Sequence, residues 1–213
     1  MTQTLLDREK LHLAGLLEAI QRCVYFLDAA SSSLSWPLNP ETLKRQKKDK
    51  ELFGALGAFN ERFAKLQDTL GAAMRHAMGL LGEPSEVFLK VLAFFEKVAA
   101  IESIEAWQNG RTARNLAAHS HETDYQLIAD HFNLLRDLLP MLYGSSARFV
   151  SYCETNLNIA PSSTDFAAEF AAIVQSIEKA LASEKPLAIE QAMAIEQAVS
   201  LEKPGATANV SKQ

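Results

Sequence analysis

Hydrophobic residues recur every three or four positions along much of the chain, which is the spacing of one face of an α-helix. The pattern predicts a first helix at residues 4–30 and a long second helix at about residues 40–81. Asn39 is suited to cap the second helix and Pro40 to its first position, because a proline has no N–H group to leave unpaired there. The apolar face of the second helix repeats like a heptad, through Leu52, Leu56, Phe59, Phe63, Leu66, Leu70 and Met74.

A third helix is predicted at residues 84–109, after a break at the sequence GEPSE. Ser85, or the turn before it, is the expected cap. Asn109 and Gly110 are expected to end or bend this helix, since both residues favour non-helical backbone.

A fourth helix is predicted at about residues 122–142, and Pro140 is expected to kink or end it. A short helix follows at residues 146–156. The four main helices indicate a helical bundle over residues 1–155, in an all-α fold.

The character of the chain changes after Asn156, where NIAPSSTDF has the composition of a linker. An amphipathic pattern over residues 163–184 and an alanine-rich stretch beyond it predict a C-terminal helical extension over residues 156–203. The last residues, 204–213, are expected to be a disordered tail.

Composition agrees with a helical protein of one main domain. The chain has 213 residues, 48% of them hydrophobic, with only nine glycines and seven prolines. A formal net charge of −5 does not suggest a nucleic-acid binder, so any such contact requires a local basic patch. Cys23 and Cys153 are expected to be reduced thiols, and the absence of a signal-like or membrane-spanning apolar run predicts a cytoplasmic protein.

The stretch GRTARNLAAHSHETDY, residues 110–125, concentrates cationic and titratable side chains. On a helix, Arg111 and Arg114 share a face, as do Asn115 and His119. Arginine recognises phosphate through several permanently charged donors, and histidine exchanges a proton near neutral pH. The stretch therefore suits phosphate chemistry without a metal, although solvated arginines beside a loop histidine would give the same spacing.

The segment Arg114-Asn115-Leu116-Ala117-Ala118-His119, with Trp107 before it, resembles the motif of the HEPN superfamily. That motif is an arginine and, after a short spacer, a histidine, very often with asparagine directly after the arginine. Arg111 also fits the common R-x-x-R-N variant. The resemblance covers about residues 5–155.

The resemblance implies a metal-independent endoribonuclease, since many HEPN proteins are RNA-cutting toxins of toxin–antitoxin or anti-phage systems. They act as homodimers whose two motifs meet at a shared cleft, and no cofactor is implied. By this resemblance Arg114 binds and stabilises the scissile phosphate, and His119 is the acid/base for the ribose 2′-hydroxyl. Asn115 would hold the backbone or orient His119. The expected products are a 2′,3′-cyclic phosphate and a 5′-hydroxyl.

One departure concerns the position two residues after His119. A branch of the family has a tyrosine there, which a nucleotidyltransferase antitoxin modifies with adenylate, whereas this chain has His121 and places Tyr125 four residues further on. Neutralisation of that kind is therefore in question. His121 is either a second acid/base or substrate-binding group, or a residue at the start of the fourth helix, capped by Ser120 or Thr123.

A second basic stretch is LKRQKKDK, residues 43–50. It is either the solvated start of the second helix or a track for the RNA backbone, and cations at a helix N-terminus are unfavourable, which favours a functional role. The residues concerned are Lys44, Arg45, Lys47 and Lys48, followed by Lys50.

Three functions remain open from the sequence. The first is the RNA-cleaving homodimer, possible antitoxin partners included. The second is a catalytically silent HEPN domain that uses Arg114 to anchor a nucleotide or a partner protein such as a nucleotidyltransferase. The third is a helical scaffold whose C-terminal helices mediate assembly, for which the side chains of Arg114 and His119 should point apart or make internal hydrogen bonds. No metal-ligand spacing such as HExxH is present, and His12, His76 and His131 are interpreted as packed or surface residues.

Overall fold

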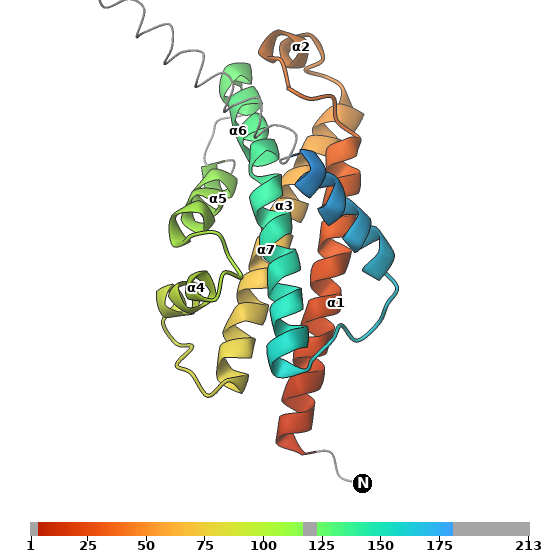
Figure 1. The fold of residues 1–213 in the computed structure, drawn as a ribbon. Coiled ribbons are helices and arrows are strands. Elements are labelled where there is room, and N and C mark those ends of the chain that lie inside the picture. The colour runs from red at the N-terminus through yellow and green to blue at the C-terminus, as the bar shows by residue number, and fades with distance from the viewer. Residues whose placement is uncertain (1–3, 117–122, 181–213) are drawn as a thin grey trace, which may run out of the picture. The chain divides into compact units, whose positions relative to one another are not determined.

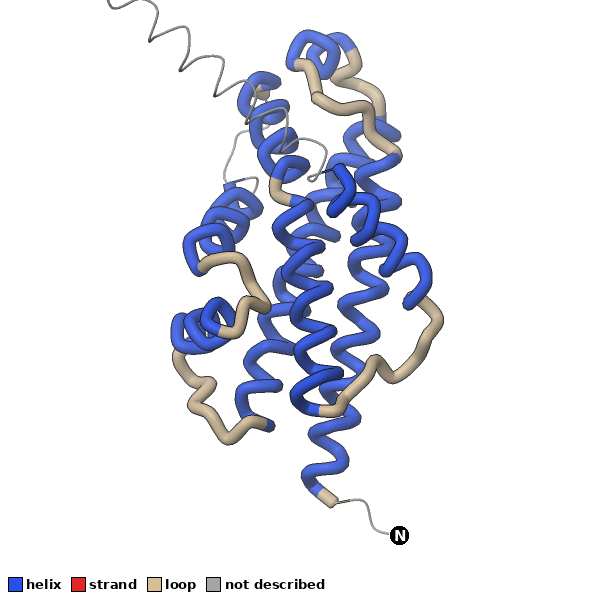
Figure 2. The backbone as a smooth tube through the Cα atoms, in the orientation of Figure 1, coloured by secondary structure: helices blue, strands red, loops and turns tan. Residues whose placement is uncertain are grey.

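A computed structural model describes residues 4–116 and 123–180, and within them every regular element is a helix (Figures 1 and 2). The fold is therefore all-α, as predicted. None of the described helices is both long and apolar enough to cross a membrane. In chain order the helices are α1 (Leu5–Ser32), α2 (Pro40–Arg45), α3 (Lys50–Leu80), α4 (Phe88–Lys97), α5 (Ile104–Leu116), α6 (Tyr125–Asp137) and α7 (Leu139–Tyr152), followed by a π-helical turn at Cys153–Leu157.

The chain forms two compact units, residues 1–175 and residues 176–213. All the helices named above belong to the first unit. In it, the long helices α1 and α3 run antiparallel and side by side, with α7 packed against both (Figure 1). α3 also contacts α4, α5 and α6, so it is the central helix of the bundle.

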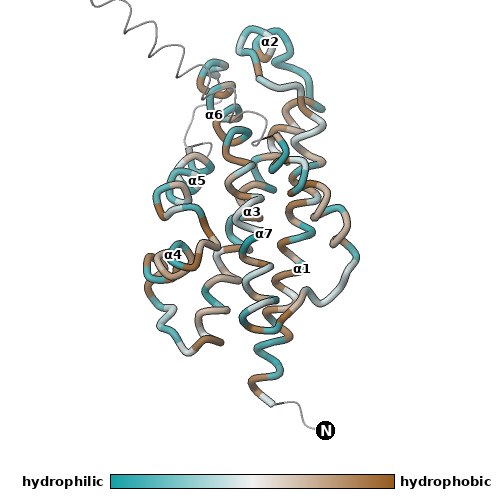
Figure 3. Tube along the Cα trace, viewed as in Figure 1, coloured by the Kyte–Doolittle hydropathy of each residue, from teal (hydrophilic) through white to brown (hydrophobic). Residues whose placement is uncertain are grey.

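The predicted apolar faces of the two long helices form the core. Of the seven residues predicted for the face of α3, all but Leu52 are buried. α1 contributes the buried side chains of Leu13, Leu17, Ile20 and Val24, and hydrophobic and hydrophilic segments alternate along both helices (Figure 3). Periodicity of this kind indicates which face is buried because burial of apolar area drives the packing.

The helix predicted over residues 40–81 is instead two helices, which corrects the sequence analysis. Asn39 caps α2 as expected, and its side chain accepts a hydrogen bond from the Thr42 N–H. α2 ends at Arg45, and Asp49 caps α3 by accepting from the N–H groups of Glu51 and Leu52. The basic stretch has no apolar residue between Leu43 and Leu52, so no buried face continues through it.

The helix predicted over residues 84–109 is also divided, into α4 and α5. Ala99 adopts a left-handed backbone conformation with φ of 57°, and Glu96 accepts a hydrogen bond from the Ile104 N–H at 2.9 Å. Ser85 is not the cap of α4, because Val87 occupies that position and makes no side-chain capping bond. The spacing of apolar residues continues across this break. Ile101 lies outside both helices, but its side chain is still buried.

Gly110 lies inside α5, so the expectation that Asn109 and Gly110 end or bend the helix is wrong. A Cβ atom at Gly110 would lie 3.2 Å from Nε2 of Gln67 and 3.4 Å from Cε of Met141. The glycine therefore allows α5 to approach α3 and α7 closely, and this packing outweighs its poor helix propensity.

Pro140 separates the fourth predicted helix into α6 and α7. Leu138 is the C-cap of α6 and the N-cap of α7. Pro140 has no N–H group to donate to a carbonyl one turn earlier, so one continuous helix is interrupted here. The cap of α6 is Asp124 rather than Ser120 or Thr123, since its side chain accepts from the N–H groups of Gln126 and Leu127. Ser120 lies outside the described residues.

The chain after α7 returns along α1. The Ser162 N–H donates to the Ala14 carbonyl at 3.0 Å, and the Phe166 ring packs against Tyr25 and Phe26. A helix begins at residue 167, and its Phe170 is buried. Residues 156–175, which the sequence analysis assigned to the extension, therefore belong to the same compact unit as the bundle. Residues 181–213 lie outside the described part.

The close approach at Gly110 is testable with a matched pair of glycine variants. Gly110→Leu should lower the free energy of unfolding by about 1–3 kcal/mol, because the side chain has no room between α3 and α7. Gly57→Ala on the exposed side of α3 should raise it by up to about 1 kcal/mol, since nothing lies within 4 Å of the added Cβ. Urea unfolding measures both, and equal effects of the two changes would contradict the packing described here.

His131 on α6 gives the bundle a dependence on pH. Burial lowers the pKa of its imidazole, and neither ring nitrogen has a hydrogen-bond partner within the described part of the chain. The unfolded chain therefore takes up a proton at higher pH than the folded protein, so stability falls as the pH drops below about 6.5. Urea unfolding at pH 7.5 and 5.5 should show a loss about 0.5–1 kcal/mol smaller in His131→Gln than in the wild type. Parallel losses in both proteins would count against this assignment.

Candidate functional site: an arginine pocket between α3 and α5

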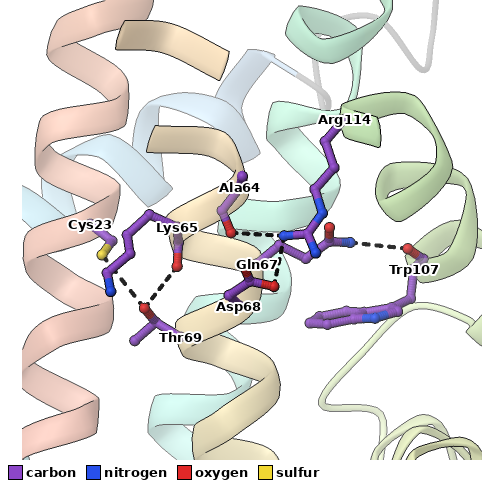
Figure 4. Close-up of polar contacts among 8 residues, drawn as sticks. All are labelled: Cys23, Ala64, Lys65, Gln67, Asp68, Thr69, Trp107 and Arg114. Atoms are coloured by element: carbon purple, nitrogen blue, oxygen red, sulfur yellow. Dashed lines mark hydrogen bonds and ion pairs between the residues drawn. The ribbon is translucent and has the colours of Figure 1, made fainter. Parts of the chain in front are cut away.

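Arg114 lies in the last turn of α5 and reaches across to α3. Its Nη1 atom donates to the Ala64 carbonyl at 2.9 Å and pairs with Oδ1 of Asp68 at 2.8 Å (Figure 4). The Arg114 side chain is only 12% exposed, whereas that of Asp68 is 65% exposed. The guanidinium is thus fixed from one side by an acceptor pair on a single turn of α3.

A second polar contact fixes α5 on α3. Nε2 of the buried Gln67 donates to the Trp107 carbonyl at 3.1 Å (Figure 4). This bond lies close to Gly110, where an added Cβ would lie 3.2 Å from Nε2 of Gln67. Gln67 and Asp68 together set the position of α5, and with it the orientation of Arg114.

These contacts frame a pocket of about 210 Å³, here named the arginine pocket. Three guanidinium groups and one carboxylate line it, together with two aromatic rings. Its floor includes Gly71, where an added Cβ would lie 3.2 Å from the Phe88 ring. The lining residues are Gln67, Asp68, Gly71, Ala72, Arg75, Phe88, Trp107, Arg111 and Arg114.

The arginine pocket carries an excess of positive charge. Among the described residues, Asp68 pairs with Arg114, and no carboxylate lies within ion-pair distance of Arg75 or Arg111. The Arg75 guanidinium lies 4.9 Å from the centre of the Phe88 ring, so a cation–π contact orders it. An anion that enters meets three guanidinium groups, of which Arg114 is held by α3 and Arg75 lies over the Phe88 ring, and arginine is well suited to bind phosphate groups.

The predicted motif residues divide into two groups. Arg111 and Arg114 come together in the arginine pocket, and Asn115 is exposed at the end of α5. His119 and His121 lie outside the described residues, so their predicted roles are untested by the structure. Tyr125 is the first residue of α6.

The basic stretch lies elsewhere, at the tip of the bundle. Lys44 and Arg45 occupy the last turn of α2, and Lys47 and Lys48 follow in the turn before α3; all four are exposed. The sequence analysis placed them at the N-terminus of a long helix, where positive charge is unfavourable. Positive charge is favourable at the C-terminus of a helix, so the position of Lys44 and Arg45 at the end of α2 has a structural reason. The argument for their functional role from an unfavourable helix N-terminus therefore no longer holds. None of the four lines the arginine pocket.

Sequence reasoning missed Asp68 and Arg75. They are seven residues apart, which places them on one face of α3, beside the small residues Gly71 and Ala72. That spacing was a usable signal for a second polar face on the helix. The packing of α5 against that face was not visible in the sequence.

No group of three or more His, Cys, Asp or Glu side chains suited to hold a metal ion occurs among the described residues. Comparisons of this chain with protein families, with curated proteins and with solved structures find no match. The site is therefore interpreted from its own geometry and chemistry.

The contacts of Arg114 predict a stability difference between the two motif arginines. Arg114→Ala should lower the free energy of unfolding by about 1 kcal/mol, because it removes a hydrogen bond and an ion pair whose acid is largely exposed. Arg111→Ala should change it by less than about 0.5 kcal/mol, since Arg111 is exposed. Urea unfolding of both variants measures the difference, and indistinguishable values would show that the α3 contacts of Arg114 contribute nothing.

Proposed function

We propose that this chain is a metal-independent endoribonuclease of HEPN type that acts as a homodimer in the cytoplasm, as a toxin or defence effector. Arg114 contacts the scissile phosphate, His119 exchanges the proton of the ribose 2′-hydroxyl, and Asn115 orients the motif. RNA is the substrate, and an antitoxin or nucleotidyltransferase is the candidate regulatory partner.

The observation that carries the proposal is the arginine pocket. In-line attack by a 2′-oxygen builds negative charge on the phosphoryl oxygens, and preorganised guanidinium groups stabilise such charge. Arg75, Arg111 and Arg114 gather in one concavity of a chain whose net charge is −5, so the positive potential is local. His119 follows Leu116, the last residue of α5, by three positions in the sequence.

The contacts of Arg114 also bear on the mechanism. Both of its interactions with α3 use Nη1, and a guanidinium has five N–H donors. Asp68 therefore positions the group and leaves other donors for a phosphate in the arginine pocket. The ion pair also keeps the cation in place when no substrate is bound, which limits the reorganisation needed for catalysis.

A catalytically silent HEPN domain is the second candidate, and the exposure of Arg75 and Arg111 beside Arg114 favours it. In that case Arg114 only anchors a nucleotide or a partner protein, and no cleavage follows. The internal hydrogen bond and ion pair of Arg114 agree with the third interpretation, a helical scaffold.

Cleavage of labelled RNA in excess EDTA tests the proposal, with a panel that includes structured tRNA. Wild type should leave 2′,3′-cyclic phosphate ends, and His119→Ala should cut at least about 100-fold more slowly, since a general acid/base contributes that much or more. Arg114→Ala should lose cleavage similarly, and its folding is checked by urea unfolding.

Two further variants separate binding from chemistry. Arg75→Ala should weaken RNA binding and lower the slope of its salt dependence by about one, because one phosphate contact is lost. Lys97→Ala, an exposed lysine on α4, serves as the charge-matched control and should change neither. If the wild type binds RNA or nucleotides at the arginine pocket and cuts none of the panel, the nuclease proposal fails and the silent domain replaces it.

A further inference from the structure

A second concave site lies where α3 faces α1. Three of its residues, Cys23, Lys65 and Thr69, lie on the opposite side of α3 from Arg114 (Figure 4). The site has a volume of about 470 Å³, within the range of small-molecule sites in proteins. We name it the α1–α3 pocket. Its lining residues are Leu16, Ala19, Arg22, Cys23 and Phe26 from α1, and Arg62, Lys65 and Thr69 from α3.

Among the described residues that line it, the α1–α3 pocket has three cations and no acid. Within the described residues, no carboxylate lies within ion-pair distance of Arg22, Arg62 or Lys65. The chain as a whole has five more acidic than basic side chains, so three cations on one pocket are a local feature. Positive charge left without a partner around a concavity favours an anionic ligand.

Two of the three cations are ordered by one aromatic ring. The guanidinium groups of Arg22 and Arg62 lie 5.7 Å and 5.1 Å from the centre of the Phe26 ring. Both distances are within the range of cation–π attraction. Stacking of this kind restricts two otherwise flexible side chains, so less conformational entropy is lost when an anion binds between them.

The interior of the α1–α3 pocket is mainly apolar. Cys23 and Thr69 meet there, with Sγ and Oγ1 4.0 Å apart, and the Thr69 hydroxyl donates to the Lys65 carbonyl at 2.7 Å (Figure 4). Burial raises the pKa of the Cys23 thiol, while Lys65, Arg22 and Arg62 act in the opposite direction. The thiol is therefore protonated at neutral pH, and Leu16 and Ala19 add further apolar surface.

We infer that the α1–α3 pocket binds an anionic amphiphile, a molecule with one phosphate or carboxylate group on an aliphatic chain. The anion lies among Arg22, Arg62 and Lys65, and the chain lies against Leu16, Ala19 and the Cys23 thiol. An inorganic anion would leave the apolar surface in contact with water. A nucleobase would need an aromatic face, and the Phe26 ring already has two guanidinium groups and Phe166 around it.

This inference does not rest on the proposed ribonuclease activity, since the α1–α3 pocket and the arginine pocket share no residue. A binding assay without RNA cleavage therefore tests it separately. Cys23 provides the readout, because it lies in the pocket, whereas Cys153 is fully buried in the core.

The experiment measures how fast N-ethylmaleimide labels Cys23 in the full chain, by peptide mass, at increasing ligand concentration. Decyl phosphate or decanoate, each below its micelle-forming concentration, should slow labelling about tenfold at saturation. Arg62→Gln/Lys65→Gln should raise the concentration for half-protection at least about tenfold, because two charge-assisted contacts are lost. Lys90→Gln/Lys97→Gln removes two exposed lysines of α4 and should leave that concentration unchanged.

Each control can overturn the inference. Decanol tests the need for charge, and inorganic phosphate tests the need for the aliphatic chain; equal protection by either would refute an amphiphile site. Protection by a short RNA at the same concentration would reassign the pocket to nucleic acid. The inference also fails if neither amphiphile protects Cys23, or if the Arg62/Lys65 variant is protected as well as the wild type.

Discussion

The antiparallel packing of α1 against α3 is the interaction on which the rest of the structure depends. Both helices bury a continuous apolar face, and α3 also contacts α4, α5, α6 and α7. Because α3 lies at the centre of the bundle, its polar side chains face different neighbouring helices. Asp68 and Arg75 face α5 and the arginine pocket, while Arg62, Lys65 and Thr69 face α1. One helix thus provides a wall of both candidate sites.

Arg114 combines a structural and a chemical property in one side chain. A guanidinium at 12% exposure needs acceptors, and Asp68 with the Ala64 carbonyl supplies them from α3. The same ion pair fixes the charge beside Arg75 and Arg111, which keep their own charges unpaired among the described residues. An internal hydrogen bond is therefore compatible with a ligand-binding role, because the acceptors occupy one edge of the group and the arginine pocket lies beside it.

The sequence was informative where periodicity alone decides the structure. It predicted the all-α fold, the buried faces of α1 and α3, the Asn39 cap and the interruption at Pro140, since each depends on local spacing or on one residue's backbone chemistry. The break at Ala99 was missed because apolar residues keep a plausible spacing across it. The break before Lys50 was missed although no apolar residue lies between Leu43 and Leu52. Gly110 was misread for a different reason: a glycine that ends a helix and one that admits a neighbouring helix look alike in sequence. Pairing of Arg114 with Asp68 depends on how α5 lies on α3, which no local pattern encodes.

The connection between α1 and α3 has a consequence for the order of folding. At the far end of the two helices, the contacts join residues as distant in sequence as Glu9 and His76. At the near end, close to the connection that contains α2, Trp36 packs on Phe59. Such a helical hairpin can close from its tip outward, adding one turn at a time, without first closing a long loop. During synthesis, α1 and α3 can therefore pair once residue 80 has left the ribosome, and the α1–α3 pocket is complete at that stage. The arginine pocket requires α5 as well, so it is assembled later in translation, on a scaffold that already exists.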